Sequence, residues 1–190
     1  MSNASKVTIL SLVLLAAGCA SLRPSGAEVP NKLRPGPNES LAMILPAEGV
    51  QIYECHARSD RSGEYEWALV APEADLYDGH GARVGSHYAG PHWESADGSR
   101  IVGTVKERAD APAARAIPWL LLTAKSVGPE GSLSKVTSVQ RVNTTGGLPP
   151  ESGCSEATAG KQARVRYTAD YCFFTRGMPV AFGSQGAGIY

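Results

Sequence analysis

The sequence predicts an all-β protein: a single antiparallel β-sandwich or barrel behind a signal peptide and a proline-rich tether. From residue 49 onward, runs of β-branched and aromatic residues alternate with turn residues about every ten positions, which is typical of such folds. Asp78-Gly79 and Asp97-Gly98 supply the positive φ that a tight hairpin needs. Only the alanine-rich residues 105–116 show a weak helical period. We therefore expect one β domain over residues 48–190.

Residues 1–18 have the pattern of a secretory signal peptide. An uncharged, mostly apolar run at residues 7–17 follows Lys6 and is shorter than the roughly 20 residues that span a bilayer. It ends in LLAAGC, where small residues precede Cys19, as in bacterial lipoprotein signals. We expect cleavage before Cys19 and lipid on its sulfur. The alternatives are an ordinary cleaved signal with an incidental cysteine, and an uncleaved apolar anchor.

A lipid on Cys19 predicts an exported protein anchored to the bacterial cell envelope. One acyl chain binds a membrane only marginally, so the several chains of a lipoprotein supply the stable anchor. Ala20 occupies the position where aspartate favours retention in the inner membrane. The outer membrane is therefore expected rather than the inner one.

Residues 19–47 are expected to form the lipidated N-terminus and a flexible tether. Prolines spread among glycine, serine and asparagine favour an extended chain over a packed element. They are Pro24, Pro30, Pro35, Pro37 and Pro46. The exception is LAMIL at residues 41–45, which we expect to dock as an edge strand, so that folding begins between about residues 40 and 48.

The expected strands follow from local patterns. Four stretches combine β-branched or aromatic residues with a neighbouring turn: 50–55, 65–70, 101–105 and 136–142. The apolar run at residues 117–122 is either a strand buried on both faces or a short core helix, which periodicity alone does not distinguish. Residues 163–171 are apolar at every odd position and polar at every even one, which predicts a strand with one core face and one wet face.

Charge argues against a nucleic-acid partner. The chain has 18 basic and 18 acidic residues, and no run of lysine or arginine stands out. Neither an electrostatic footprint for nucleic acid nor a polybasic lipid-binding patch is present.

Three cysteines remain after Cys19, and they allow three pairings. An exported protein favours one disulfide and one free thiol. Cys172 lies at the end of a predicted strand, whereas Cys154 lies in a Pro/Gly/Ser loop that a covalent link would order, so we favour Cys55 with Cys154. That bond would close a loop of about 100 residues and stabilise the fold by about 4 to 5 kcal/mol in the loop-entropy model. The alternative is three separate thiols.

The segment HYAGPHWESADGS at residues 87–99 holds the main candidates for chemistry. His87, His92, Glu94 and Asp97 are metal-competent types, and imidazole with carboxylate suits a divalent metal or acid/base catalysis. Against this, Gly90-Pro91 between the histidines is incompatible with a helical ligand pair. Acids beside a hairpin turn also bond the local backbone. A structural corner with polar groups facing solvent is the alternative interpretation.

Aromatic residues are candidates for a ligand surface. Trp93 and Tyr88 lie among polar neighbours, and aromatic rings offer large, rigid contact area to a glycan or small molecule. Trp119 lies inside the apolar run and is expected in the core. No G-x-S-x-G nucleophile elbow is present.

A set of short motifs occurs together over residues 40–175. They are GVQIYEC at 49–55, Trp67, APEADL at 71–76, VGSHYAGP at 84–91, WE at 93–94, DGS at 97–99, IPWLLL at 117–122, QRVNTTGG at 140–147 and YTADY at 167–171. The combination resembles the domain-of-unknown-function family numbered 3455, found in bacterial envelope proteins and fungal secreted proteins and without an agreed activity. The resemblance implies export and a single β domain, and it places Cys55 and Cys154 where the family tends to carry cysteines.

Some fungal relatives in that family carry a malate dehydrogenase label, which the residues here do not support. A nicotinamide site needs a glycine-rich turn between a strand and a helix. The glycines at residues 79–85 have the wrong spacing and run into a strand-like segment containing Gly90-Pro91. No nicotinamide cofactor is expected.

Two functional hypotheses from different classes follow. The leading one is a lipid-anchored, non-enzymatic envelope protein whose β domain binds a ligand, a glycan or a partner. The alternative is a metal-assisted or general acid/base hydrolase that uses residues 87–97. The hydrolase requires His87, His92, Glu94 and Asp97 to converge in one pocket.

Overall fold

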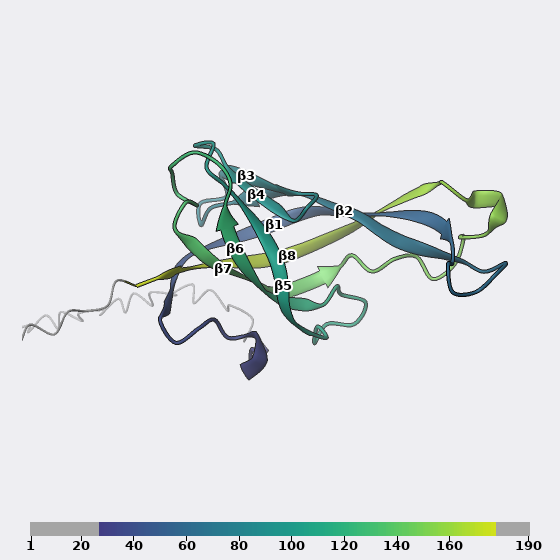
Figure 1. Ribbon diagram of the computed structural model, residues 1–190, viewed down its shortest axis with the longest axis horizontal. Helices are drawn as coiled ribbons and strands as arrows, with labels where there is room; N and C mark the ends of the chain where they lie inside the picture. Colours follow the sequence, from purple (N-terminus) through teal and green to yellow (C-terminus); the bar gives the residue numbers. More distant parts are fainter. Residues whose placement is uncertain (1–26, 178–190) are drawn as a thin grey trace, which may run out of the picture.

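The chain folds into one closed antiparallel β-barrel of eight strands, in which each strand pairs with its sequence neighbours and β8 closes the ring against β1 (Figure 1). The computed structural model describes residues 27–177. The strands are β1 (Glu39–Ala57), β2 (Tyr65–Tyr77), β3 (Arg83–Tyr88), β4 (His92–Ser95), β5 (Arg100–Ala109), β6 (Trp119–Ser126), β7 (Val136–Gly146) and β8 (Gln162–Arg176). The predicted all-β class is confirmed, and the barrel is the alternative that forms.

The helical content of the described residues is limited to two short 3-10 turns, η1 (Asn31–Leu33) and η2 (Glu156–Thr158). Within residues 27–177, no helix has the length and apolar character needed to cross a membrane. The hydrogen-bonded ring closes within the same residues, so the barrel requires no other part of the chain to complete its sheet.

The alternation predicted for residues 163–171 is realised in β8. Tyr167, Ala169 and Tyr171 are buried in the barrel interior, together with Phe173 further along the strand. The residues between them face outward on the other side of the pleat. The β-strand period therefore sets which side chains of β8 form the core.

Within the apolar run at residues 117–122, strand β6 begins at Trp119, and both of its faces are covered because the N-terminal segment packs on the outside of the barrel. β6 directs Leu122 into the main core, whereas Trp119 and Leu121 join a second cluster on the outer wall. That cluster contains Leu33 of η1, which is fully buried. The side-chain amide of Gln140 donates to the Leu33 carbonyl at 2.7 Å and fixes the segment against β7.

The ordered part of the chain starts earlier than its composition suggests. Tether-like composition extends to residue 47, but β1 begins at Glu39 and pairs with β8 from that residue onward. Pairing with β2 starts only at Ala47, so Pro46 lies just outside that ladder. Proline is tolerated where a strand lacks a partner on one side, and the LAMIL stretch at 41–45 therefore forms part of a long first strand.

A disulfide joins Cys55 to Cys154, as the sequence predicted. It links the end of β1 to the long β7–β8 connection, which carries η2 at the right-hand end of Figure 1. Backbone hydrogen bonds from Cys55 to Lys161 and from Gly160 to Cys55 support the same contact. Cys172 is the free cysteine of the described residues; it lies in the outer cluster, where burial raises the pKa of its thiol to about 11.

The short strands β3 and β4 leave a gap in the barrel wall. β2 pairs with β3 only from Ala74 to Tyr77, and β5 pairs with β4 only from Arg100 to Val102. Residues 65–73 of β2 and 104–109 of β5 thus have no partner strand on the sides that flank the β3–β4 hairpin. The barrel is open sideways at this point.

Candidate functional site

The gap leads into a cavity of about 490 Å³ inside the barrel. This volume lies within the range of about 300 to 1,000 Å³ that small-molecule sites occupy. Residues from β1, β2, β5, β6, β7 and β8 and from the β3–β4 hairpin line it. They are Gln51, Tyr53, Leu69, Val70, Ala71, Pro72, His87, Gly90, Pro91, Trp93, Val105, Arg108, Ile117, Pro118, Leu120, Leu122, Arg141, Leu148, Pro149 and Tyr171.

The rim and the floor of the cavity differ in character. At the gap, Leu69, Val70 and Val105 are 58%, 51% and 53% exposed, which is unusual for large apolar side chains. At the floor, the His87 ring stacks on Trp93 with 4.4 Å between ring centroids, and Tyr171 packs against His87 at 4.9 Å. A ligand entering through the gap would pass aliphatic groups and reach an aromatic floor.

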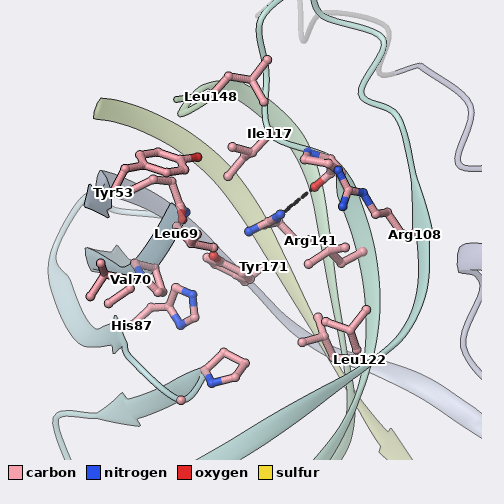
Figure 2. Close-up of a pocket in the computed structure, with 18 of the residues that line it drawn as sticks. Tyr53, Leu69, Val70, His87, Arg108, Ile117, Leu122, Arg141, Leu148 and Tyr171 are labelled. Carbon is pink, nitrogen blue, oxygen red and sulfur yellow. Dashed lines mark hydrogen bonds between the residues drawn. The ribbon is translucent and has the colours of Figure 1, made fainter. Parts of the chain in front are cut away.

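Arg141 is the charged group inside the cavity (Figure 2). Its Nε and Nη2 donate to the Pro118 carbonyl at 3.1 and 2.8 Å, which fixes the guanidinium. Within residues 27–177, no carboxylate forms an ion pair with Arg141 or with Arg108. Arg108 lies at the exposed side of the same cavity.

Two buried donors of the cavity lining have no partner among the described residues. They are Nε2 of Gln51 and Nε1 of Trp93, and both residues are at least 98% buried. Tyr53 differs, because its hydroxyl donates to the Gly147 carbonyl at 2.6 Å. Buried polar groups are nearly always hydrogen-bonded, so the two free donors mark positions where a ligand or ordered water would supply acceptors.

His87 is a neutral imidazole built into the cavity wall. It is 3% exposed, and its Nδ1–H donates to the His92 carbonyl at 2.8 Å. A carbonyl only accepts, so the neutral ring has its proton on Nδ1, and Nε2 is an acceptor. Burial lowers the pKa of His87 to about 3, since the charged ring would lose its hydration.

His92 and Glu94 lie on the opposite face of the sheet. Register pairs His87 with Trp93 and Tyr88 with His92, so His87 points inward while Tyr88, His92 and Glu94 point outward. His92 donates from Nδ1 to the Ala89 carbonyl at 2.7 Å and stacks on Tyr88. The Tyr88 hydroxyl donates to Glu94 Oε2 at 2.6 Å, and this hydrogen bond lowers the pKa of Glu94.

Both carboxylate oxygens of Asp97 accept hydrogen bonds from nearby loop residues. One carboxylate oxygen accepts from the backbone and hydroxyl of Ser99 at 2.9 and 2.6 Å. The other accepts from the Ser132 backbone at 2.7 Å. These bonds hold the pKa of Asp97 well below its usual range and connect the β4–β5 turn to the β6–β7 loop.

The structure therefore does not bring the four candidate side chains of residues 87–97 together. His87 is inside the barrel, His92 and Glu94 are on the outer face, and Asp97 is committed to a turn. Among residues 27–177, no group of three or more histidine, cysteine or acidic side chains is arranged to hold a metal ion. The convergence that the hydrolase hypothesis requires is not present.

The two candidate ligand-surface residues also separate. Trp93 is 1% exposed and lines the cavity from within, whereas Tyr88 lies outside and bonds Glu94. The polar neighbours of Trp93 in the sequence are the outward-facing residues of the same short strand. The lipidation candidate, Cys19, and the signal peptide at residues 1–18 lie outside the described residues.

Comparison with known proteins assigns the chain to a family. The family model described as a protein of unknown function, DUF3455, matches residues 35–175. The chain belongs to the DUF3455 family. The match begins just before β1 and ends within β8, so the DUF3455 unit is the closed barrel itself. No curated protein and no solved structure matches the chain.

The sequence interpretation missed the cavity residues of this DUF3455 barrel that carry charge or free donors. Arg141 and Arg108 are isolated arginines in strands, where an arginine normally faces water. In β7 the neighbours Gln140 and Val142 are buried because the N-terminal segment covers the outer face, so no exposed outer face marks Arg141 as facing inward. That cover depends on contacts between distant parts of the chain, which a local pattern does not reveal.

Proposed function

We propose that this protein is a lipid-anchored envelope protein whose barrel binds one apolar small molecule in the internal cavity. The observation that carries the proposal is the 490 Å³ cavity, with mostly apolar walls and an opening between β2 and β5. An eight-stranded barrel has an interior of the size that side chains fill or one small ligand occupies. Here the side chains leave part of it free.

Binding is favoured over catalysis because the polar groups of the cavity lack a reactive arrangement. His87 is neutral and oriented by a backbone carbonyl, and no acid lines the cavity to serve as its partner. A catalytic base also needs a nucleophile or a substrate proton within hydrogen-bond reach, and among residues 27–177 the His87 ring hydrogen-bonds the His92 carbonyl alone. The lining instead has the features of a binding site, with large apolar area and few polar groups.

A small molecule is also favoured over a glycan or a protein partner. Glycan sites present aromatic faces together with many hydroxyl-binding groups, but the aromatic residues here are at the floor of an apolar cavity. The outer aromatic Tyr88 already stacks on His92 and bonds Glu94. The anchor is supported by the LLAAGC pattern before Cys19, which would hold the barrel at a membrane surface, beside a source of apolar molecules.

The test uses residues 20–190, which contain the whole closed barrel, and the uncharged fluorophore N-phenyl-1-naphthylamine. We expect its emission to rise and saturate at one molecule per chain. Replacing Leu69→Asp places a charge on the apolar rim, and we expect affinity to fall about tenfold or more, because an apolar ligand cannot solvate the carboxylate. Leu69 is 58% exposed, so the substitution leaves the core intact.

The matched control is Leu41→Asp, at a residue that is 51% exposed and does not line the cavity. It should bind the fluorophore like the unmodified chain. Equal losses in the two variants would show that the dye binds surface patches, and no saturable emission would reject the cavity as a binding site.

A further inference from the structure

We infer that the ligand of this cavity is an apolar molecule carrying one carboxylate, with the carboxylate held by Arg141 and the apolar body directed along the aliphatic lining toward the rim. This inference rests on the proposed function, since it names the ligand class of the same cavity. It is carried by a row of inward-facing residues, by the absence of acids from the lining and by two unpartnered donors.

The row is set by strand register. Arg108 of β5 pairs with Leu120 of β6, Leu120 pairs with Arg141 of β7, and Arg141 pairs with Tyr171 of β8. All four residues line the cavity. Neighbouring strands lie about 4.8 Å apart, so the two arginine backbones are about 10 Å apart on the same inner face. The guanidinium groups of Arg108 and Arg141 therefore enter the cavity from the same wall.

No charge within the cavity compensates these arginines. Its twenty lining residues include no aspartate and no glutamate. The Pro118 carbonyl orients Arg141 but is neutral, and it engages Nε and Nη2, which leaves Nη1 available to an incoming acceptor. Arg141 also acts electrostatically on its neighbours, since its charge opposes the rise that burial causes in the pKa of Tyr53 and Tyr171. Arg141 is half-buried and has no carboxylate partner among the described residues, and an anionic ligand would supply one through charge-assisted hydrogen bonds.

The free hydrogen-bonding groups point to the same chemistry. Gln51 Nε2 and Trp93 Nε1 are donors, both buried and both without a partner in the described residues. In Figure 2, Arg141 points into the space between Tyr53 and Tyr171, with His87 below them. A carboxylate accepts up to four hydrogen bonds and donates none, which matches a site whose unsatisfied groups are donors.

The shape of the cavity sets the size of the anion and the nature of the rest of the ligand. One arginine lies inside, and the second lies at the exposed side, so a compact head with a single charge fits better than a polyphosphate. Beyond the row, the lining is mostly apolar and includes Leu122, Leu148 and the rim aliphatics. An alkyl chain or a flat ring system would fill this part of the cavity.

The test compares three ligands with the same ten-carbon chain: decanoate, decanol and decylamine. Calorimetric titration of residues 20–190 at pH 7 should give about 10- to 100-fold tighter binding for decanoate than for decanol, and the weakest binding for decylamine. Arg141→Gln should abolish the preference for decanoate while decanol still binds. Arg166→Gln, which removes one charge from the outer face of β8, is the matched control and should leave the preference unchanged.

A second variant and the ligand series keep the inference testable if Arg141→Gln does not fold. Gln51→Leu removes a free donor without touching a hydrogen bond, and it should weaken decanoate several-fold and decanol not at all. Equal affinity for decanoate and decanol in the unmodified chain would overturn the inference while leaving the proposed function in place. Failure of both to bind would overturn the proposed function as well. Decyl phosphate is then titrated in the same way, and tighter binding of decyl phosphate than of decanoate would overturn the carboxylate assignment.

Discussion

At the scale of single residues, the burial of His87 makes the stability of the fold depend on pH. Its pKa is about 3 in the folded chain and about 6.5 in an unfolded one, because burial penalises the charged ring. Between these values the unfolded state binds a proton that the folded state does not. The contribution of His87 to the free energy of unfolding is therefore fully present above pH 6.5, where the ring is neutral in both states. It is lost as pH falls toward 3.

We expect the free energy of unfolding, measured with urea between pH 6.5 and 5, to fall with decreasing pH at a slope that approaches about 1.4 kcal/mol per pH unit from this residue. His87→Phe keeps an aromatic ring on Trp93 and should remove that slope. His80→Gln, at an exposed position in the β2–β3 turn, is the control and should retain it. The same slope in His87→Phe and the unmodified chain would show that His87 is protonated while folded.

At the scale of elements, β1 and β2 cross closely at Gly49. A Cβ atom there would lie 2.1 Å from the Glu73 carbonyl oxygen and 2.5 Å from the Ala74 side chain. The contact is with backbone of the paired strand, so it cannot be relieved by a side-chain rotation. Glycine at such a position lets a strand bend around a small barrel.

Gly49→Ala should therefore lower the free energy of unfolding by about 2 kcal/mol or more, as overpacked sites do. Gly79→Ala provides the comparison, since nothing lies within 4 Å of a Cβ at that turn, and it should change stability by less than about 0.5 kcal/mol. Urea unfolding of both variants measures the difference. Similar stabilities would mean that the two strands separate at little cost.

At the scale of the whole molecule, the disulfide and the segment that leads to the proposed anchor lie at opposite ends of β1. The Cys55–Cys154 bond joins β1 to the β7–β8 connection at one end of the barrel. At the other end of β1, the packed segment with η1 connects the barrel to the part of the chain that contains Cys19. A lipid on Cys19 would thus tether a folded cavity to the membrane by a short linker.

Cys19→Ser should move the protein from the membrane pellet to the soluble fraction of lysed cells and abolish labelling by an alkyne-tagged fatty acid. Ala20→Asp leaves the lipidated cysteine in place, so it should retain the label and shift the protein toward the inner membrane. Continued pelleting of Cys19→Ser would indicate an uncleaved apolar anchor instead of a lipid.

Local patterns were sufficient where one residue's environment depends on its neighbours in the chain. The odd positions of residues 163–171 predicted the core face of β8, and the loop composition around Cys154 predicted its pairing with Cys55. Patterns failed where distant segments supply the environment. Leu33 covers the outer face of β6 and β7. The separation of His87 from His92 has a different cause, which is the register of one hairpin: His87 pairs with Trp93, so His92 lies on the opposite face.

By itself, the sequence determined that this chain is built from antiparallel strands, which residues form most of them, and which family it resembles, and it favoured the cysteine pairing that the structure shows. Only the tertiary structure decided that the strands close into a barrel, that β3 and β4 are too short to complete its wall, and that Arg108 and Arg141 face one cavity. The physical reason is register. Propensity and alternation act between neighbours in the chain, whereas the pairing of β5 through β8 places together residues that are far apart in sequence.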